Sequence, residues 1–180
     1  MSIEKENFKI FKYLIESGAK PNLKDQFGNT ALHQASILEK NLFFILLTSF
    51  NGNINVQNVN GWTCMHMAAF YNRHKIIKKM LPNKKAPIDI PDKENYLPLH
   101  IAAARGSFET VDLLVKRGSD VNALSSRGET PVLLASLNKH PTIVRLLIDY
   151  KADISIKDLK GDFHFFFFFF FDKFFWFICI

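Results

Sequence analysis

The sequence predicts an all-α solenoid of helix–turn–helix units joined by short hairpin-like turns. Two observations point to this fold: one motif recurs four times at nearly constant spacing, and each copy is followed by a segment with helical apolar periodicity. The motif is anchored by Ala35, Ala68, Ala102 and Ala135, so the steps between copies are 33, 34 and 33 residues. A unit of this size cannot bury its apolar faces alone, whereas a stack of such units can.

Each unit begins with a short helix. The four copies read "DQFGNTALHQAS" from Asp25, "NVNGWTCMHMAA" from Asn58, "DKENYLPLHIAA" from Asp92 and "SSRGETPVLLAS" from Ser125. A Thr near the start of a copy can cap the helix, and Pro98 and Pro131 stand where a first helical turn tolerates proline. Small residues then line one face, as in "HIAAARG", and Gly106 ends the helix.

A second helix and an extended turn complete each unit. In the third unit the second helix carries apolar residues at helical spacing, among them Val111 and Leu114. Gly118 can stop this helix in the left-handed conformation, and "SDVNALSSRG" leads into the next unit. The additional residue in the 34-residue step falls in "MLPNKKAPIDIPD", whose prolines predict a loop.

These elements divide the chain into three parts. Residues 1–24 predict a partial N-terminal unit with only a second helix and its turn. Residues 25–160 hold four full units (25–57, 58–91, 92–124 and 125–157) and the start of a fifth. Residues 161–180 form a Phe-rich low-complexity tail.

The recurring motif resembles that of the ankyrin-repeat family, whose period is 33 residues with the signature T-P-L-H-x-A. Here it stands as "TALHQA" (30–35), "TCMHMA" (63–68), "LPLHIA" (97–102) and "TPVLLA" (130–135), and the resemblance covers roughly residues 8–162. The resemblance implies a non-enzymatic scaffold or adaptor that binds a protein partner on its concave face. It also implies that His33, His66 and His100 are structural and form hydrogen bonds between neighbouring repeats.

The alternative for these three histidines is a metal site. Residues one repeat apart form a ladder along a stack instead of a converging cluster, and no Cys or carboxylate recurs beside them. We therefore expect no metal and no cofactor. The sequence contains none of the glycine-rich phosphate-binding or nucleophile motifs of common enzymes, and Cys64 is expected to be a small buried residue.

Composition favours an intracellular protein, which we expect to be cytoplasmic and monomeric. The two cysteines, Cys64 and Cys179, are too few for a disulfide framework, and the charged N-terminus does not resemble a secretory signal. The formal net charge of +6 is compatible with acidic partners but does not establish one.

The expected partner-binding residues lie at hairpin tips and on short helices. In three successive units the residue that follows the turn Gly, or Asn95 in its place, is Trp62, Tyr96 or Glu129. Phe27 is expected close by. In the family resembled, this position lies near the hairpin tips of the concave face, and the short helices add Met67, Phe70, Tyr71 and Arg105. Exposed aromatics of this kind anchor interfaces. The alternative is that Trp62 and Tyr96 only pack against neighbouring turns.

A basic patch occupies "RHKIIKKMLPNKK", with no acidic residue among its cations. Its members are Arg73, Lys75, Lys78, Lys79, Lys84 and Lys85. Such a patch can attract an acidic partner, phospholipid or nucleic acid, or it can be a solvated face that happens to be basic. Nucleic acid is not favoured, because no aromatic residues for base stacking are interleaved with the cations.

The tail "HFFFFFFFDKFFWFICI" does not continue the repeat, because Phe168 falls in the register of the anchoring alanines. One interpretation is translation of a T-rich intron or a frameshift. Another is a hydrophobic anchor over 163–180, which would make this a membrane-tethered ankyrin protein, although Asp172 and Lys173 interrupt it. A folded cap is a third. The chain is also compatible with a fragment of a larger multidomain protein.

Overall fold

A computed structural model of the chain describes residues 2–38, 41–81 and 88–159. Within these ranges the regular structure is nine helices and no strand, which confirms the predicted all-α repeat fold. Asp162 and the tail, together with Lys84 and Lys85 of the basic patch, lie outside the described residues.

The helices alternate along the chain between two kinds. The first helices of the four units have seven residues each: α2 (Ala31–Ile37), α4 (Cys64–Phe70), α6 (Pro98–Ala104) and α8 (Pro131–Leu137). The second helices are α3 (Asn41–Ser49), α5 (His74–Met80), α7 (Phe108–Lys116) and α9 (Pro141–Asp149). They are preceded by α1 (Ser2–Glu16).

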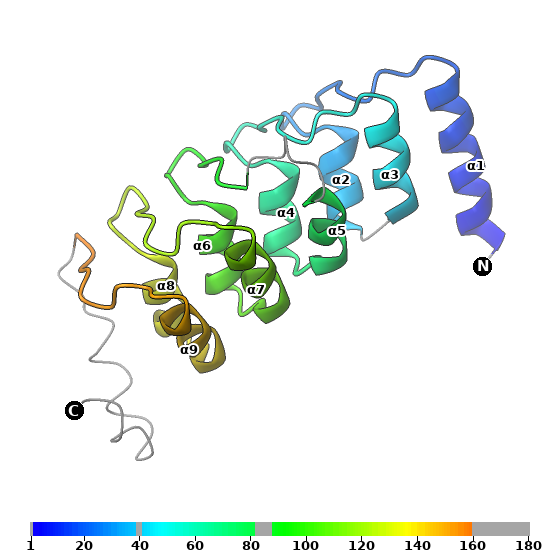
Figure 1. The fold of residues 1–180 in the computed structure, drawn as a ribbon. Coiled ribbons are helices and arrows are strands. Elements are labelled where there is room, and N and C mark those ends of the chain that lie inside the picture. The colour runs from blue at the N-terminus through cyan, green and yellow to red at the C-terminus, as the bar shows by residue number, and fades with distance from the viewer. Residues whose placement is uncertain (1, 39–40, 82–87, 160–180) are drawn as a thin grey trace.

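The units stack in sequence order into two rows of helices, with the hairpin-like turns projecting along one side (Figure 1). Helices α2, α4, α6 and α8 contact one another in order and form the first row. The second row is α1, α3, α5, α7 and α9, so α1 takes the place of a second helix. Each of the other second helices also packs on the first helix of its own unit.

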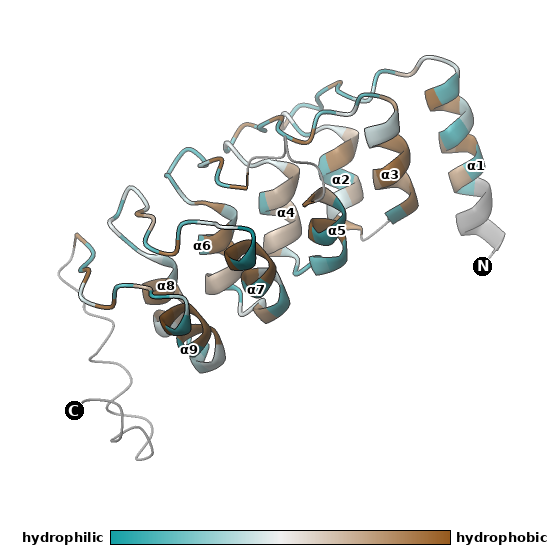
Figure 2. Ribbon diagram, viewed as in Figure 1, coloured by the Kyte–Doolittle hydropathy of each residue, from teal (hydrophilic) through white to brown (hydrophobic). Residues whose placement is uncertain are grey.

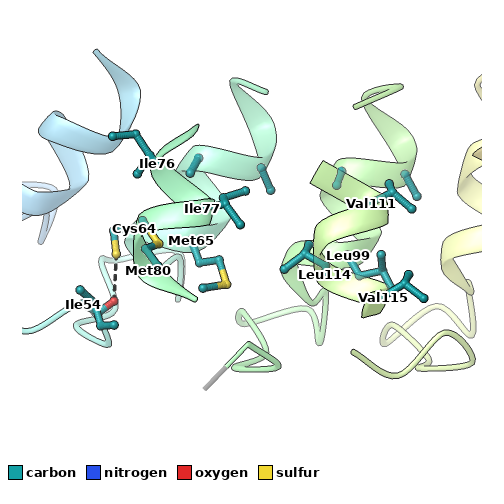
Figure 3. Close-up of a cluster of buried hydrophobic side chains, with 14 of the residues drawn as sticks. Ile54, Cys64, Met65, Ile76, Ile77, Met80, Leu99, Val111, Leu114 and Val115 are labelled. Atoms are coloured by element: carbon teal, nitrogen blue, oxygen red, sulfur yellow. Dashed lines mark hydrogen bonds between the residues drawn. The ribbon is translucent and has the colours of Figure 1, made fainter. Parts of the chain in front are cut away.

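The core lies between the two rows, and its residue types explain why the rows approach closely. The anchoring alanines Ala35, Ala68, Ala102 and Ala135 are all buried, so their small side chains let neighbouring helices meet. Larger side chains such as Leu99 and Leu114 fill the space between first and second helices (Figure 3). Apolar residues concentrate on the helices, whereas the turns are largely hydrophilic (Figure 2).

Helix starts follow from local chemistry. Pro98 and Pro131 begin α6 and α8, where their missing N–H groups cost no helical hydrogen bond. At α8 the Thr130 hydroxyl accepts a hydrogen bond from the backbone N–H of Leu133.

The hairpins are held by side-chain oxygens at their first residue. Asp25, Asn58 and Asp92 each accept backbone N–H bonds from the residues two and four positions later, and the Ser125 hydroxyl does the same. Successive hairpins are joined by one backbone bond each: Val59 to Phe27, Lys93 to Asn60, Ser126 to Glu94 and Leu159 to Arg127. The hairpins therefore form a hydrogen-bonded ladder along the stack.

The close spacing of the hairpins requires glycine at Gly61. Its φ is +81°, and a Cβ there would lie 2.7 Å from the backbone nitrogen of Lys93 in the next hairpin. Gly18 has a similar φ of +94°, but a Cβ added there would meet nothing within 4 Å. A comparison of substitutions at Gly18 and Gly61 therefore distinguishes the free-energy cost of the left-handed conformation from that of the contact between hairpins.

We predict that Gly61→Ala destabilises the chain more than Gly18→Ala. The left-handed conformation alone costs a non-glycine residue about 1–2 kcal/mol, and only Gly61 adds a backbone collision. Urea unfolding of both variants measures the difference, which we expect to exceed about 1 kcal/mol. Equal losses for the two variants would show that the hairpins do not pack as closely as described.

Candidate functional site

Three buried histidines bridge neighbouring units. The Nδ1 atoms of His33, His66 and His100 accept the backbone N–H groups of Thr30, Thr63 and Leu97, at 3.0, 3.2 and 3.0 Å. Because Nδ1 is the acceptor, the proton lies on Nε2. Each Nε2–H then donates to the next hairpin: at 3.0 Å to the carbonyl oxygens of Trp62, Tyr96 and Ala123 respectively, with the Glu129 carbonyl at 3.2 Å from His100.

Both ring nitrogens of each histidine are therefore used by backbone groups of the protein. Burial lowers the pKa of His33, His66 and His100, and the backbone bonds from Nε2 oppose that shift. Coulombic attraction to Asp25 raises the pKa of His33, and attraction to Asp92 raises those of His66 and His100, in each case as a smaller effect. The rings are held neutral as structural bridges. The fourth unit has Leu133 at this position.

Cys64 is buried in α4, where its thiol donates to the Ile54 carbonyl oxygen at 3.1 Å (Figure 3). Burial raises the pKa of the thiol to about 12, so at neutral pH it is not a thiolate. Cys64 therefore packs as a small core residue.

Four of the expected partner-binding residues form one cluster on the side of the hairpins and first helices. The Phe70 ring lies 5.4 Å from the Trp62 ring and 5.1 Å from the Tyr71 ring. The Arg105 guanidinium stands over Phe70 at 4.5 Å from the ring centroid. Tyr71 and Arg105 are exposed, and Trp62 and Phe70 are half-buried. We call Trp62, Phe70, Tyr71 and Arg105 the aromatic cluster.

Trp62 and Tyr96 also stabilise the stack. The indole Nε1–H of Trp62 donates to a carboxylate oxygen of Asp92 at 3.0 Å, one hairpin further along. The Tyr96 hydroxyl donates to the Glu129 carboxylate, again one hairpin on. Burial and then this bond raise the pKa of Tyr96 to about 12. Trp62 and Tyr96 thus both pack against the following hairpin, which is the alternative that the sequence left open. Glu129 is engaged as well, because it accepts the Tyr96 hydroxyl.

Phe27 and Met67 stand apart from these contacts. The Phe27 side chain is 58% exposed at the first hairpin tip, where its backbone carbonyl accepts the hydrogen bond from Val59. Met67 is half-buried on α4. The first helices beside the aromatic cluster carry no charged residue: α2, α4, α6 and α8 together contain no Asp, Glu, Lys or Arg. Arg105 directly follows α6.

Comparison with known proteins identifies the fold family. The family described as "Ankyrin repeats (3 copies)" matches residues 1–92 and 74–158, which together span most of the chain. This chain belongs to the ankyrin-repeat family.

The match spans less than a quarter of the length of two curated ankyrin-repeat relatives and most of the length of a third. Human palmitoyltransferase ZDHHC13 is 31% identical over 139 residues, which cover 74% of this chain and 22% of that protein. Dog inversin is 28% identical over 160 residues, covering 84% of this chain and 15% of inversin. The probable 26S proteasome regulatory subunit p28 of Saccharomyces cerevisiae is 27% identical over 201 residues, covering 88% of this chain and 87% of p28.

The basic patch of the second ankyrin unit is divided by the structure. Lys75, Lys78 and Lys79 are exposed on α5, in the row of second helices. Arg73 differs, because it is half-buried and its Nε–H donates to the Ile37 carbonyl oxygen of α2 at 2.8 Å. Arg73 therefore joins two repeats, and the three lysines are the described part of the patch that faces solvent.

Arg73 belongs to a second ladder that sequence reasoning missed. Arg73, Ser107 and His140 occupy the same repeat position, just before α5, α7 and α9. Each side chain donates to a carbonyl oxygen at the end of the first helix of the preceding unit: Arg73 to Ile37, Ser107 to Ala69 (3.5 Å) and His140 to Ala104 (3.2 Å). The residue types differ, so only their 34- and 33-residue spacing could have signalled the ladder.

We predict that the ankyrin stack loses stability as the pH falls below about 6.5, the pKa of an unperturbed histidine. The three buried histidines have lowered pKa values, so the unfolded chain takes up protons that the folded chain refuses. The free energy of unfolding is then complete above pH 7 and decreases on acidification until the folded rings protonate. Chemical unfolding at about pH 7.5, 6.5, 5.5 and 5.0 measures this slope.

His66→Gln is the matched variant, because it removes one of the three titrating rings. We expect it to lower stability at neutral pH and to reduce the slope between pH 6.5 and 5 by about one third, since it removes one of three linked protons. An unchanged slope would contradict the assignment of His66 as a buried neutral bridge.

Proposed function

We propose that this chain is a non-enzymatic scaffold or adaptor that binds a protein partner on its concave face. Ankyrin repeats generally mediate protein–protein interactions, and the family is typically non-catalytic. The observation that carries the proposal is the row of four first helices without a charged residue, together with the aromatic cluster beside α4 and at the end of α6. Aromatic and Arg side chains dominate the binding energy of protein interfaces.

The first helices present apolar side chains next to this cluster. Ile101 and Leu134 stand one and two repeats after Met67, and all three are partly exposed. Leu38 is 59% exposed and Leu137 is 37% exposed at the ends of the same row. A patch of this kind is more apolar than a solvated surface requires, which favours a partner that buries it.

Two acidic groups of the hairpins beside this face are already engaged. Asp92 accepts the Trp62 indole and two backbone N–H groups, and Glu129 accepts the Tyr96 and Ser125 hydroxyls. Arg105 is therefore the exposed charge that a partner would meet beside the aromatic rings. A partner segment with apolar side chains and a carboxylate opposite Arg105 fits this face best.

A membrane-tethered form rests only on residues 163–180, which lie outside the described residues. Within 2–38, 41–81 and 88–159, no helix combines the length and the apolar character that a membrane crossing needs. A cytoplasmic location and a monomeric state belong to the proposal, and so does a role as the ankyrin module of a larger protein. Lys75, Lys78 and Lys79 offer a second possible binding surface on α5. The experiment below compares this surface with the aromatic cluster.

We predict that the double variant Tyr71→Ala/Arg105→Glu loses its protein partner. Immobilised chain is incubated with cell lysate and captured proteins are quantified against the wild type. Removing the exposed ring and reversing the charge should reduce recovery of the specific partner at least about tenfold, the equivalent of about 1.4 kcal/mol. Both side chains are exposed, so the melting temperature should change little.

The matched control is Lys78→Glu/Lys79→Glu, which reverses two exposed charges on α5. It should leave recovery unchanged. If the control variant loses the partner while Tyr71→Ala/Arg105→Glu retains it, the partner binds the row of second helices and the proposal is wrong.

A further inference from the structure

The N-terminal helix α1 exposes apolar side chains at two positions that are largely buried in the other second helices. One face of α1 packs on α3 through Phe8 and Phe11, whose rings lie 5.3 and 4.7 Å from the Phe43 ring. On another face, Ile10 and Leu14 lie one helical turn apart and are 59% and 52% exposed. These two residues define what we call the α1 edge.

The repeat register shows how unusual this exposure is. Leu14 occupies the position of Leu47, Met80, Leu114 and Leu147, which are at most 1% exposed. Ile10 occupies the position of Phe43, Ile76, Thr110 and Ile143, of which Phe43 is half-buried and the other three are at most 1% exposed. A leucine at this position is thus part of the core wherever a unit is complete.

The missing cover is a first helix. Helices α3, α5, α7 and α9 each pack on the first helix of their own unit, and within the described residues α1 has none. In the third unit, Leu99 of α6 lies beside Leu114 and Val115 of α7 (Figure 3). Leu147 is buried although the described residues give α9 only one neighbouring second helix, α7. One neighbouring second helix together with an own first helix is therefore sufficient cover.

We infer that the α1 edge is a docking surface for one further helix of the first-helix type, supplied by an adjoining ankyrin segment. Each first helix contacts its own second helix, and successive first helices contact one another, so the entering helix would pack on α1 and extend the row α2, α4, α6 and α8. This surface differs from the concave face of the proposed function.

The chemistry of the occupant follows from the helices it would imitate. The four first helices carry no Asp, Glu, Lys or Arg, and a charge facing Leu14 and Ile10 would be buried without a partner. The occupant must also place small residues against its neighbour, as Ala102 and Ala103 do in α6, where both are fully buried. A charged amphipathic helix does not meet these requirements.

The repeat register within α1 fixes the junction for the test, which replaces the first turns of α1. Phe8 stands at the repeat position of Phe108, and Asn7 at that of Ser107. A chimera in which residues 92–107 are copied in place of residues 1–7 therefore supplies a hairpin, a first helix and its cap, followed directly by Phe8. The remaining chain, residues 8–180, is unchanged.

We predict that this chimera melts at least about 5 °C above the parent chain, because two large apolar side chains become buried. Leu14→Ser should shift the melting temperature of the parent by less than about 1 °C but remove most of the gain in the chimera. Lys9→Ser is the matched control, since Lys9 stands at the position of the exposed Glu109 and should have the same small effect in both proteins.

Two results would overturn the inference. The first is a folded chimera with no gain in melting temperature, or a gain that survives when the copied Leu99 is replaced by Lys. The second is a concentration-dependent dimer of the parent, measured by sedimentation, that Leu14→Ser dissociates, because the α1 edge would then be a contact between two copies of this chain.

Discussion

The stack depends above all on one recurrent interaction, the buried imidazole that joins each of the first three full units to the next. In each of His33, His66 and His100, one nitrogen accepts the N–H at the start of its own first helix and the other donates to the following hairpin. The ring thus satisfies an otherwise orphan helical donor and a hairpin carbonyl together. Leu97 makes the same backbone bond as Thr30 and Thr63, so the bridge requires the main chain and not a hydroxyl group.

Some side chains hold the stack together, and others remain available to bind a partner. Hairpin backbones, the histidines, Trp62 and Tyr96 are engaged between units. Tyr71 and Arg105 lie at the exposed ends of the first helices. In the described residues neither makes a hydrogen bond between units, and both side chains lie against the Phe70 ring. A repeat array that holds a few exposed aromatic and cationic side chains in place loses little conformational entropy on binding.

Much of this architecture could be predicted because each repeat repeats the same chemical requirement. The alanines at 35, 68, 102 and 135 fixed the register, and Pro98 and Pro131 marked two helix starts that the structure confirms. The ladder of Arg73, Ser107 and His140 escaped prediction, because unlike side chains perform the same task there. Sequence also could not decide whether Trp62 and Tyr96 face a partner or the next hairpin, since that depends on where Asp92 and Glu129 lie.

The protonation state of the three rings tests the role of the histidine bridges most directly. Long-range ¹H–¹⁵N NMR spectra of the imidazoles at pH 7 distinguish the two neutral forms and the charged form. We expect His33, His66 and His100 all to carry their proton on Nε2, with Nδ1 unprotonated. A proton on Nδ1 of any of the three, or a charged ring at pH 7, would break the bond to the helix start and contradict the bridging role.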